Sequence, residues 1–202
     1  MKKTLICAVV AMVFAVSGLA SGTVIVIDPD AFPDGADISN VFPGVTLSAT
    51  GSTPATSTVF SITNSISSTG TQVFGHDGEY DNYWGLVSGT SFEASFRSDF
   101  DSLVKFVSLD FIPNDSYDPG ILQAFNSAGV LLDRVDTPGN SGSGSVETAT
   151  ISRAMPDISY VLASTPRGVS IFLDHMVFEV PEPATICLLG LGGLLLRRRK
   201  SA

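Results

Sequence analysis

Cysteine is nearly absent from this chain of 202 residues. The only two cysteines, Cys7 and Cys187, lie in apolar segments at the two ends, so residues 21–183 contain none. A disulfide scaffold, the usual support of small exported domains, is therefore excluded for that body. About 160 residues can bury a hydrophobic core without such help, so the body is expected to fold on apolar packing alone.

Basic residues are also scarce in the body. Over residues 21–183, five basic residues stand against twenty acidic ones, which leaves a net charge of −15. Such a surface repels nucleic acid and anionic lipid, but it tolerates divalent cations and neutral sugars. We therefore expect no nucleic-acid partner. The alternative interpretation of the acidity is that it only keeps an exported protein soluble.

The motifs of common catalytic sites are missing as well. The sequence has no G-x-S-x-G, H-E-x-x-H or C-x-x-C motif and no phosphate-binding glycine loop. Of the two histidines, His76 and His175, the second lies in a strand pattern typical of a packing or edge residue. Glu79 and Asp81 form a carboxylate pair, but any acidic loop offers such pairs. The prediction is a non-catalytic protein, and a secreted carbohydrate-active enzyme on a β-sandwich is the alternative.

Residues 1–20 have the three-part plan of a secretory signal peptide. Lys2 and Lys3 precede an uncharged stretch over Thr4–Val16, and small residues follow, with cleavage expected after Ala20 or Gly22. This pattern predicts export through the Sec machinery. An uncleaved N-terminal membrane anchor is the alternative.

The C-terminal end carries a second apolar run. Ala184–Leu196 contains no charge, and as a helix it would be about 20 Å long against a bilayer core of about 30 Å. Three glycines weaken it as a water-soluble helix, and the basic block Arg197–Lys200 fits the cytoplasmic side of a membrane. A single transmembrane helix with the body outside is therefore predicted, and a buried C-terminal helix is the alternative.

The sequence "VPEPATICLLGLGGLLLRRRKSA" (residues 180–202) resembles the PEP-CTERM sorting signal of bacterial envelope proteins, and the signal itself is expected over residues 181–202. That signal combines a Pro-Glu-Pro motif, a short apolar span and a basic C-terminus. The matching residues are Pro181, Glu182 and Pro183 in the motif and Arg197, Arg198 and Arg199 in the basic cluster.

This resemblance implies a substrate of an exosortase, a membrane transpeptidase-like enzyme that processes its substrates near the motif. It also implies a diderm bacterium that makes exopolysaccharide or biofilm matrix. The protein would be anchored in the inner membrane before processing and would then reach the cell surface or the extracellular space.

Residues 21–180 show β periodicity throughout, with turn residues at short intervals. The segment "TSFEASF" places Phe92, Ala94 and Phe96 on one face, and "LVKFVSLDFI" (Leu103–Ile112) reads as one central strand, apolar on both faces. Residues 126–129 predict a hairpin connection that ends in glycine. Eight to ten short strands with this spacing indicate an all-β fold, a single β-sandwich or jelly-roll domain.

Segments of the body resemble galactose-binding-like jelly rolls. They are "GADISNVFPGVTLSAT", "VSLDFIPN", "LQAFNSAGVLLDRV" and "IFLDHMVFEV", spread over residues 35–180. The resemblance implies sugar contact through loops at one end or through a concave sheet face. Polysaccharide is therefore the expected partner.

The stretch "DPDAFPDGAD" gathers carboxylates that predict a calcium site. Its candidate ligands are Asp28, Asp30 and Asp34, with Asp37 nearby, and Asp174 or Glu179 from the last strand could join them. Calcium takes 6–8 oxygen ligands, which loop carboxylates and carbonyls supply. The alternative is a solvated turn in which Asp side chains cap backbone N–H groups.

The stretch "HDGEYDNYW" is the densest mixture of polar and aromatic residues. Tyr80, Tyr83 and Trp84 are predicted to form a platform for sugar rings. The alternative is a buried tryptophan whose N–H is satisfied in the core. The sequence thus predicts an exported, surface-sorted, non-catalytic protein of the envelope or extracellular matrix that contacts carbohydrate.

Overall fold

The computed structural model describes residues 22–78, 81–86, 93–115, 117–139, 142–166 and 169–180. The expected signal peptide and the sorting tail lie outside these ranges. Val24–Val180 forms one compact unit. Within the described residues, no helix has the length and apolar character needed to cross a membrane.

The described chain is built almost entirely of β-strands, which confirms the predicted all-β class. It contains more strands than the eight to ten expected from the sequence. The elements are β1 (Thr23–Ile27), a 3-10 turn η1 (Pro29–Ala31), β2 (Ala36–Asp37), β3 (Val45–Thr50), β4 (Val59–Thr63), β5 (Gln72–His76), β6 (Trp84–Leu86), β7 (Glu93–Val104), β8 (Phe106–Pro113), β9 (Ile121–Phe125), β10 (Leu131–Asp136), β11 (Glu147–Ser152), β12 (Ile158–Ser164) and β13 (Val169–Val180).

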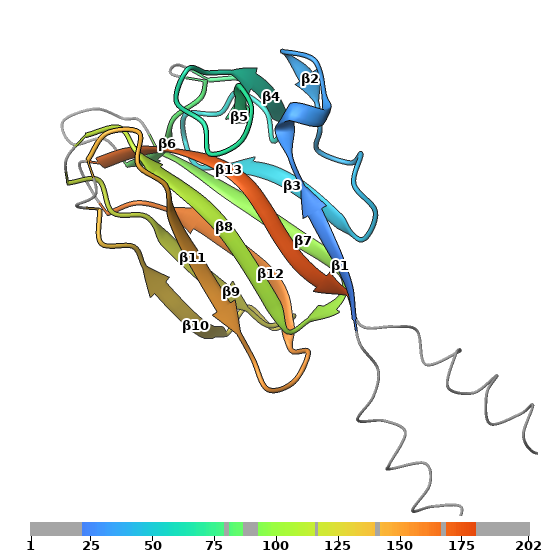
Figure 1. Ribbon diagram of the computed structural model, residues 1–202. Helices are drawn as coiled ribbons and strands as arrows, with labels where there is room; N and C mark the ends of the chain where they lie inside the picture. Colours follow the sequence, from blue (N-terminus) through green and yellow to red (C-terminus); the bar gives the residue numbers. More distant parts are fainter. Residues whose placement is uncertain are drawn as a thin grey trace, which may run out of the picture. The chain divides into compact units, whose positions relative to one another are not determined.

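The strands lie in two layers, as expected of a β-sandwich of the jelly-roll type (Figure 1). In sheet I, β13 pairs with β8, β5, β6 and β1, while β11 and β4 extend the sheet through β8 and β5. In sheet II, the order is β10-β9-β12-β7-β3, with every neighbouring pair antiparallel. One backbone pair, Gly85 with Ala94, joins β6 to β7 and so connects the two sheets.

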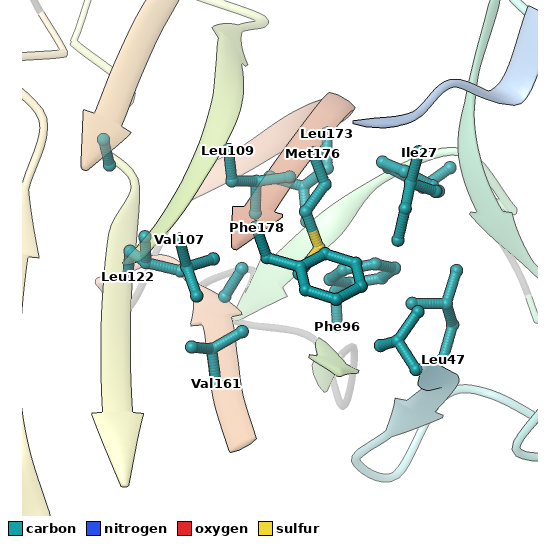
Figure 2. Close-up of a cluster of buried hydrophobic side chains, with 14 of the residues drawn as sticks. Ile27, Leu47, Phe96, Val107, Leu109, Leu122, Val161, Leu173, Met176 and Phe178 are labelled. Atoms are coloured by element: carbon teal, nitrogen blue, oxygen red, sulfur yellow. The ribbon is translucent and has the colours of Figure 1, made fainter. Parts of the chain in front are cut away.

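The core fills the space between the two sheets. Figure 2 shows Leu109 and Phe178 of sheet I together with Phe96 and Val161 of sheet II in one apolar cluster. Along β7 and β11, buried residues alternate with exposed or half-exposed ones. Each strand therefore gives one face to the core and one to the outside.

The segment Leu103–Ile112 is not one strand, so that prediction was wrong. β7 of sheet II ends at Val104, a bend lies at Lys105, and β8 of sheet I begins at Phe106. Val104 and Val107 both lie in the core because the chain crosses from one sheet to the other at this point. The crossing explains why this segment looks apolar on both faces.

The predicted hairpin is present between β9 and β10 and is one residue longer than expected. Asn126 organises it, because its side-chain oxygen accepts hydrogen bonds from the N–H groups of Ala128 and Val130, both at 3.0 Å. Gly129 has a φ of 75°, a left-handed conformation that glycine adopts without strain. This hairpin fixes the register of β10 on β9, at the edge of sheet II.

Candidate functional site

The residues of the predicted sorting motif, from Pro181 onward, lie outside the described residues. The structure does show where the body ends. β13 runs to Val180, whose side chain packs against the core, and Glu179 beside it pairs with Lys105 at 3.3 Å. The folded body therefore extends to the residue directly before the Pro-Glu-Pro motif.

Three of the predicted calcium ligands converge on one hydroxyl. Thr69 Oγ1 lies 3.3 Å from Asp28 Oδ1, 3.2 Å from Asp30 Oδ2 and 3.3 Å from Asp174 Oδ2. The turn η1 places Asp28 and Asp30, because Asp28 caps the turn by accepting from the Asp30 N–H at 2.9 Å. Since a hydroxyl donates only one hydrogen, most of the compensation for these carboxylates has to come from other groups.

Backbone donors of the segment that leads into β5 supply that compensation. Asp174 is fully buried and accepts hydrogen bonds from Ser68 N, Ser68 Oγ and Thr69 N, at 2.8 to 3.0 Å. Asp30 accepts from Thr71 N at 2.7 Å and from Gln72 N at 3.1 Å. Burial raises the pKa of the Asp174 carboxyl above its ordinary value. The carboxylates thus fix residues 68–72 onto the turn η1 and onto the last strand, β13.

The other predicted ligands lie elsewhere. Asp34 accepts from the Thr63 N–H at 2.6 Å, and Asp37 accepts from the Ser39 N–H at 2.9 Å. In the part of the chain that the structure describes, no three acidic, histidine or cysteine side chains are grouped so that they could hold a metal ion. The structure joins Asp174 to Asp28 and Asp30 and separates Asp34 from them, and calcium binding stays a prediction.

Trp84 does not belong to an exposed sugar platform, so that part of the prediction was wrong. Its side chain is fully buried, and its Nε1–H donates to the carbonyl of Phe74 at 2.8 Å. Tyr83 is half-buried against Phe172, with ring centroids 4.8 Å apart. Tyr80 lies outside the described residues. An indole ring enclosed in the core offers no face to a sugar.

His76 is buried next to Trp84 and does not act as an exposed base. Its Nδ1 accepts from the Gly78 N–H at 3.0 Å, so the ring hydrogen lies on Nε2, which contacts the carbonyl of Tyr83 at 3.0 Å. Burial lowers the pKa of His76 from its ordinary value. The ring is therefore held neutral, with both nitrogens engaged by the backbone.

His175 interrupts the regular pairing of β13. The register between β13 and β8 shifts at this residue, and its φ of 39° lies in the left-handed region that favours glycine. Its Nδ1 lies 3.7 Å from Asp110 Oδ2, beyond hydrogen-bond distance, while Asp110 Oδ1 accepts from Thr148 Oγ1 at 2.6 Å. The hydroxyl is bonded to the carboxylate rather than to the imidazole, so the trio lacks the arrangement of an activated nucleophile.

The outer face of sheet II carries a ladder of aromatic and charged side chains that sequence reasoning missed. The rings of Phe125 on β9 and Tyr160 on β12 are stacked, with centroids 4.8 Å apart and planes at 7°. Arg97 on β7 places its Cζ 3.8 Å from the centroid of the Tyr160 ring. The same guanidinium donates twice to Asp99, at 2.6 and 2.7 Å. Strand register brings these residues together, and no local motif marks them.

This ladder belongs to a larger surface, which we call the polar face. Cross-strand register defines it as two rows that run across the five strands of sheet II. The first row is Ser48, Arg97, Leu162, Gln123 and Arg134; the second is Thr46, Asp99, Tyr160, Phe125 and Leu131. Their inward-facing neighbours, such as Leu47, Phe96 and Val161, lie in the core. The polar face is therefore the solvent side of the sheet.

Solved structures offer distant likenesses to the sandwich. The K2 cleaved adhesin domain of Lys-gingipain is 10% identical with a TM-score of 0.49, covering 77% of this chain and 99% of that chain. A family 29 carbohydrate binding module is 11% identical with a TM-score of 0.41, covering 79% and 90%. An exo-β-1,3-galactanase from Phanerochaete chrysosporium is 14% identical with a TM-score of 0.41, covering 77% of this chain and 29% of that one. These values support no statement about a ligand.

Sequence comparison identifies the tail. No match to the chain is found among curated proteins. The family model of the PEP-CTERM protein-sorting motif matches residues 179–200, which include the Pro-Glu-Pro sequence and the arginine cluster. The chain therefore carries a PEP-CTERM sorting motif, as its sequence predicts, and this motif implies an exported protein sorted by an exosortase.

Proposed function

We propose that this protein is a non-catalytic component of the cell surface or extracellular matrix that contacts polysaccharide. In this proposal a signal peptide directs export, the C-terminal run holds the chain in the inner membrane, and an exosortase then processes the tail. The observation that carries the proposal is the match of the sorting motif to residues 179–200, directly at the end of the folded body.

The junction between body and tail supports a role for the tail as a handling tag. The motif match begins at Glu179, and Glu179 and Val180 are the last two residues of β13. Ion pairing with Lys105 and packing of Val180 hold this end of the strand on the body. Processing beyond Val180 would therefore leave the described sandwich intact.

The histidine environments favour a non-catalytic body over the alternative of a carbohydrate-active enzyme. His76 is buried and neutral, and His175 is not hydrogen-bonded to a nucleophile. Of the carboxylate pair considered for a glycosidase, Asp81 is exposed and Glu79 lies outside the described residues. A reducing-sugar assay on polysaccharides that the protein binds distinguishes the two: binding without release of sugar ends is expected, and turnover would support the enzyme.

Processing and location test the sorting proposal in cells that export the protein. Glu182→Ala and deletion of residues 184–202 are both expected to stop the conversion of precursor to a shorter, surface-located form, as followed by immunoblot of membrane, surface and medium fractions. Glu93→Ala is the matched control, because Glu93 is an exposed carboxylate on β7 far from the motif in sequence. If both tail variants are processed and located like the unaltered protein, the sorting proposal fails.

A further inference from the structure

The polar face is open to solvent while the opposite side of the same sheet is fully packed. Its two ion pairs lie in water-accessible positions: the side chains of Arg97 and Asp99 are 32% and 43% exposed, and those of Arg134 and Asp136 are 46% and 53% exposed. Arg97 and Arg134 are two of the only five basic residues in the body. Their placement on one face of one sheet sets that face apart from the rest of a strongly acidic surface.

Charge is balanced on the polar face once Asp136 of β10, which lies next to the two rows, is counted. Arg97 pairs with Asp99 and Arg134 pairs with Asp136, each through two hydrogen bonds between guanidinium and carboxylate. Acidic residues border the rows instead, since Glu93 and Asp101 lie exposed toward the two ends of β7. An anionic polymer would meet these borders and the net charge of −15, whereas an uncharged polymer meets no repulsion.

The polar face offers a dense set of hydrogen-bond donors and acceptors. A guanidinium carries five N–H donors, of which a carboxylate pair uses two, and the amide of Gln123 supplies both donor and acceptor. The hydroxyl groups of Ser48, Thr46 and Tyr160 add more of both kinds. The five strands span roughly 19 Å at about 4.8 Å per neighbour, so the groups form a strip suited to an extended, hydroxyl-rich chain.

The ring of Tyr160 can offer its edge, rather than its faces, to a ligand. Tyr160 on β12 lies between Phe125 on β9 and Arg97 on β7. Its ring is stacked on the ring of Phe125 and is covered by the guanidinium of Arg97. The two neighbours cover the faces of this ring, so a ligand can meet only its edge and its phenolic hydroxyl, which also lies close to the Arg97 guanidinium. The stack also holds Arg97 in place, which pre-orders a donor that would otherwise lose conformational entropy on binding.

A protein partner fits this surface less well. The centres of protein interfaces are depleted of charged residues and are more apolar than the surrounding surface. Here the central strand β12 contributes Leu162 and Tyr160 to the strip, and the charged Arg97 and Asp99 lie directly beside them on β7. Phe125 and Leu131 are the other apolar residues of the two rows. Hydrogen bonding to hydroxyl groups makes better use of this arrangement than apolar docking does.

We infer that the polar face of sheet II binds an uncharged polysaccharide, through hydrogen bonds from Arg97, Arg134, Gln123 and the Tyr160 hydroxyl. This inference rests on the proposed function, since it supplies the surface for the polysaccharide contact proposed above.

Affinity electrophoresis of the full-length exported protein tests the inference. Native gels contain a neutral β-glucan, galactan or mannan, or alginate as the anionic comparison. The unaltered protein is expected to be retarded by at least one neutral polysaccharide and not by alginate. Tyr160→Phe, which keeps the ring stack, and the double variant Gln123→Ala with Arg134→Ala are each expected to weaken retardation about tenfold or more.

Arg153→Ala is the matched control. Arg153 makes the same kind of two-bonded pair with Asp157, and it lies in the loop that follows β11 rather than on the polar face. It also donates to the Leu132 carbonyl at 3.3 Å, so the control reports as well on a small disturbance of β10. Its removal is expected to leave retardation unchanged within about twofold, a change of only about 0.4 kcal/mol. A melting curve for each variant confirms that the fold is retained.

The possible outcomes distinguish a failure of the polar-face site from a failure of the proposed polysaccharide contact. Retardation that persists in both polar-face variants overturns this site and leaves polysaccharide contact standing. Retardation by alginate alone overturns the choice of an uncharged partner. A protein that no gel retards overturns the inference together with the polysaccharide part of the proposed function. A change of oligomeric state in the variants, measured by sedimentation, would instead make the polar face a contact between copies.

Discussion

The outer faces of the two sheets carry similar polar groups, which are buried on sheet I and exposed to solvent on sheet II. On sheet I, the segment before β5 folds back over the sheet, where Ser68 and Thr69 donate to the buried Asp174 and Ile66 packs with Val73, Ile112 and Phe172. On sheet II, Arg97 pairs with Asp99 and lies over the Tyr160 ring, and the ion pair is about one-third exposed to solvent.

The comparison indicates that burial under another segment decides whether a polar group stabilises the fold or is available to a partner. A buried carboxylate needs its hydrogen bonds to be stable, so Asp174 and its donors act as an internal fastening between the last strand and a loop. An exposed ion pair adds little stability, so the polar face is free to serve a partner. Stability measurements on the two faces should therefore differ sharply.

The largest effect is expected on the covered face. Asp174→Ala leaves the N–H groups of Ser68 and Thr69 without their buried acceptor, and the free energy of unfolding is expected to fall by about 3 kcal/mol or more. Asp174→Asn keeps one acceptor oxygen and should cost less. Urea denaturation measures the free energy of unfolding of both variants. Equal, small losses would contradict the claim that Asp174 holds residues 68 and 69 on the last strand.

Calcium should strengthen the same face if Asp28, Asp30 and Asp174 bind it together. At a calcium concentration 100 times the Kd, binding adds about 2.7 kcal/mol to the free energy of unfolding and raises the Tm accordingly. Asp30→Asn should remove the increase, and Asp34→Asn should keep it because Asp34 lies apart from the cluster. Identical melting curves in EDTA and in calcium would eliminate the calcium prediction.

Acidification should weaken sheet I through His76, at the end of β5. Burial lowers the pKa of His76 in the folded state, whereas the unfolded chain takes up a proton near its ordinary pKa of about 6.5. The stability that the neutral ring contributes is therefore present above about pH 6.5 and is lost as the pH falls below it, by up to about 1.4 kcal/mol per pH unit. Denaturation at pH 7.5 and 5.5 should show a smaller loss in His76→Gln than in the unaltered protein, and an equal loss would contradict the assignment.

The smallest effect on stability is expected on the polar face. Arg97→Ala removes an ion pair that is about one-third exposed and should cost less than about 1 kcal/mol, although it removes a proposed ligand contact. A destabilisation as large as that of Asp174→Ala would show that the polar face is a structural element. The comparison between the two faces would then fail.

The sequence predicted the fold class well because short apolar strands, some of them alternating as β11 does, are separated by turn residues at short intervals. The patterns at β11, β12 and β13 mark strands whose inward residues fill the core, and the hairpin at residues 126–130 is marked by Asn126 and Gly129. The crossing at Lys105 was missed because both sheets share one core, so apolar residues continue through the bend.

The candidate site was harder to predict because it depends on contacts between distant segments. Trp84 lies in a polar stretch, yet its N–H finds the Phe74 carbonyl inside the core. Arg97, Phe125 and Tyr160 come from three separate strands, and only the register of sheet II places them side by side. Asp174 was expected from the sequence to lie near Asp28 and Asp30. The position of the Thr69 hydroxyl among these three carboxylates could not be predicted, because no local pattern around Thr69 marks it.

The intact mass of the exported protein tests the central claim most directly. A sorted exosortase substrate should be released as a chain that begins after Ala20 or Gly22 and ends near the Pro181–Pro183 motif, and its melting curve should show the sandwich still folded. Released protein whose mass still includes residues 184–202 would contradict the account, because the tail would then not be a tag that is removed.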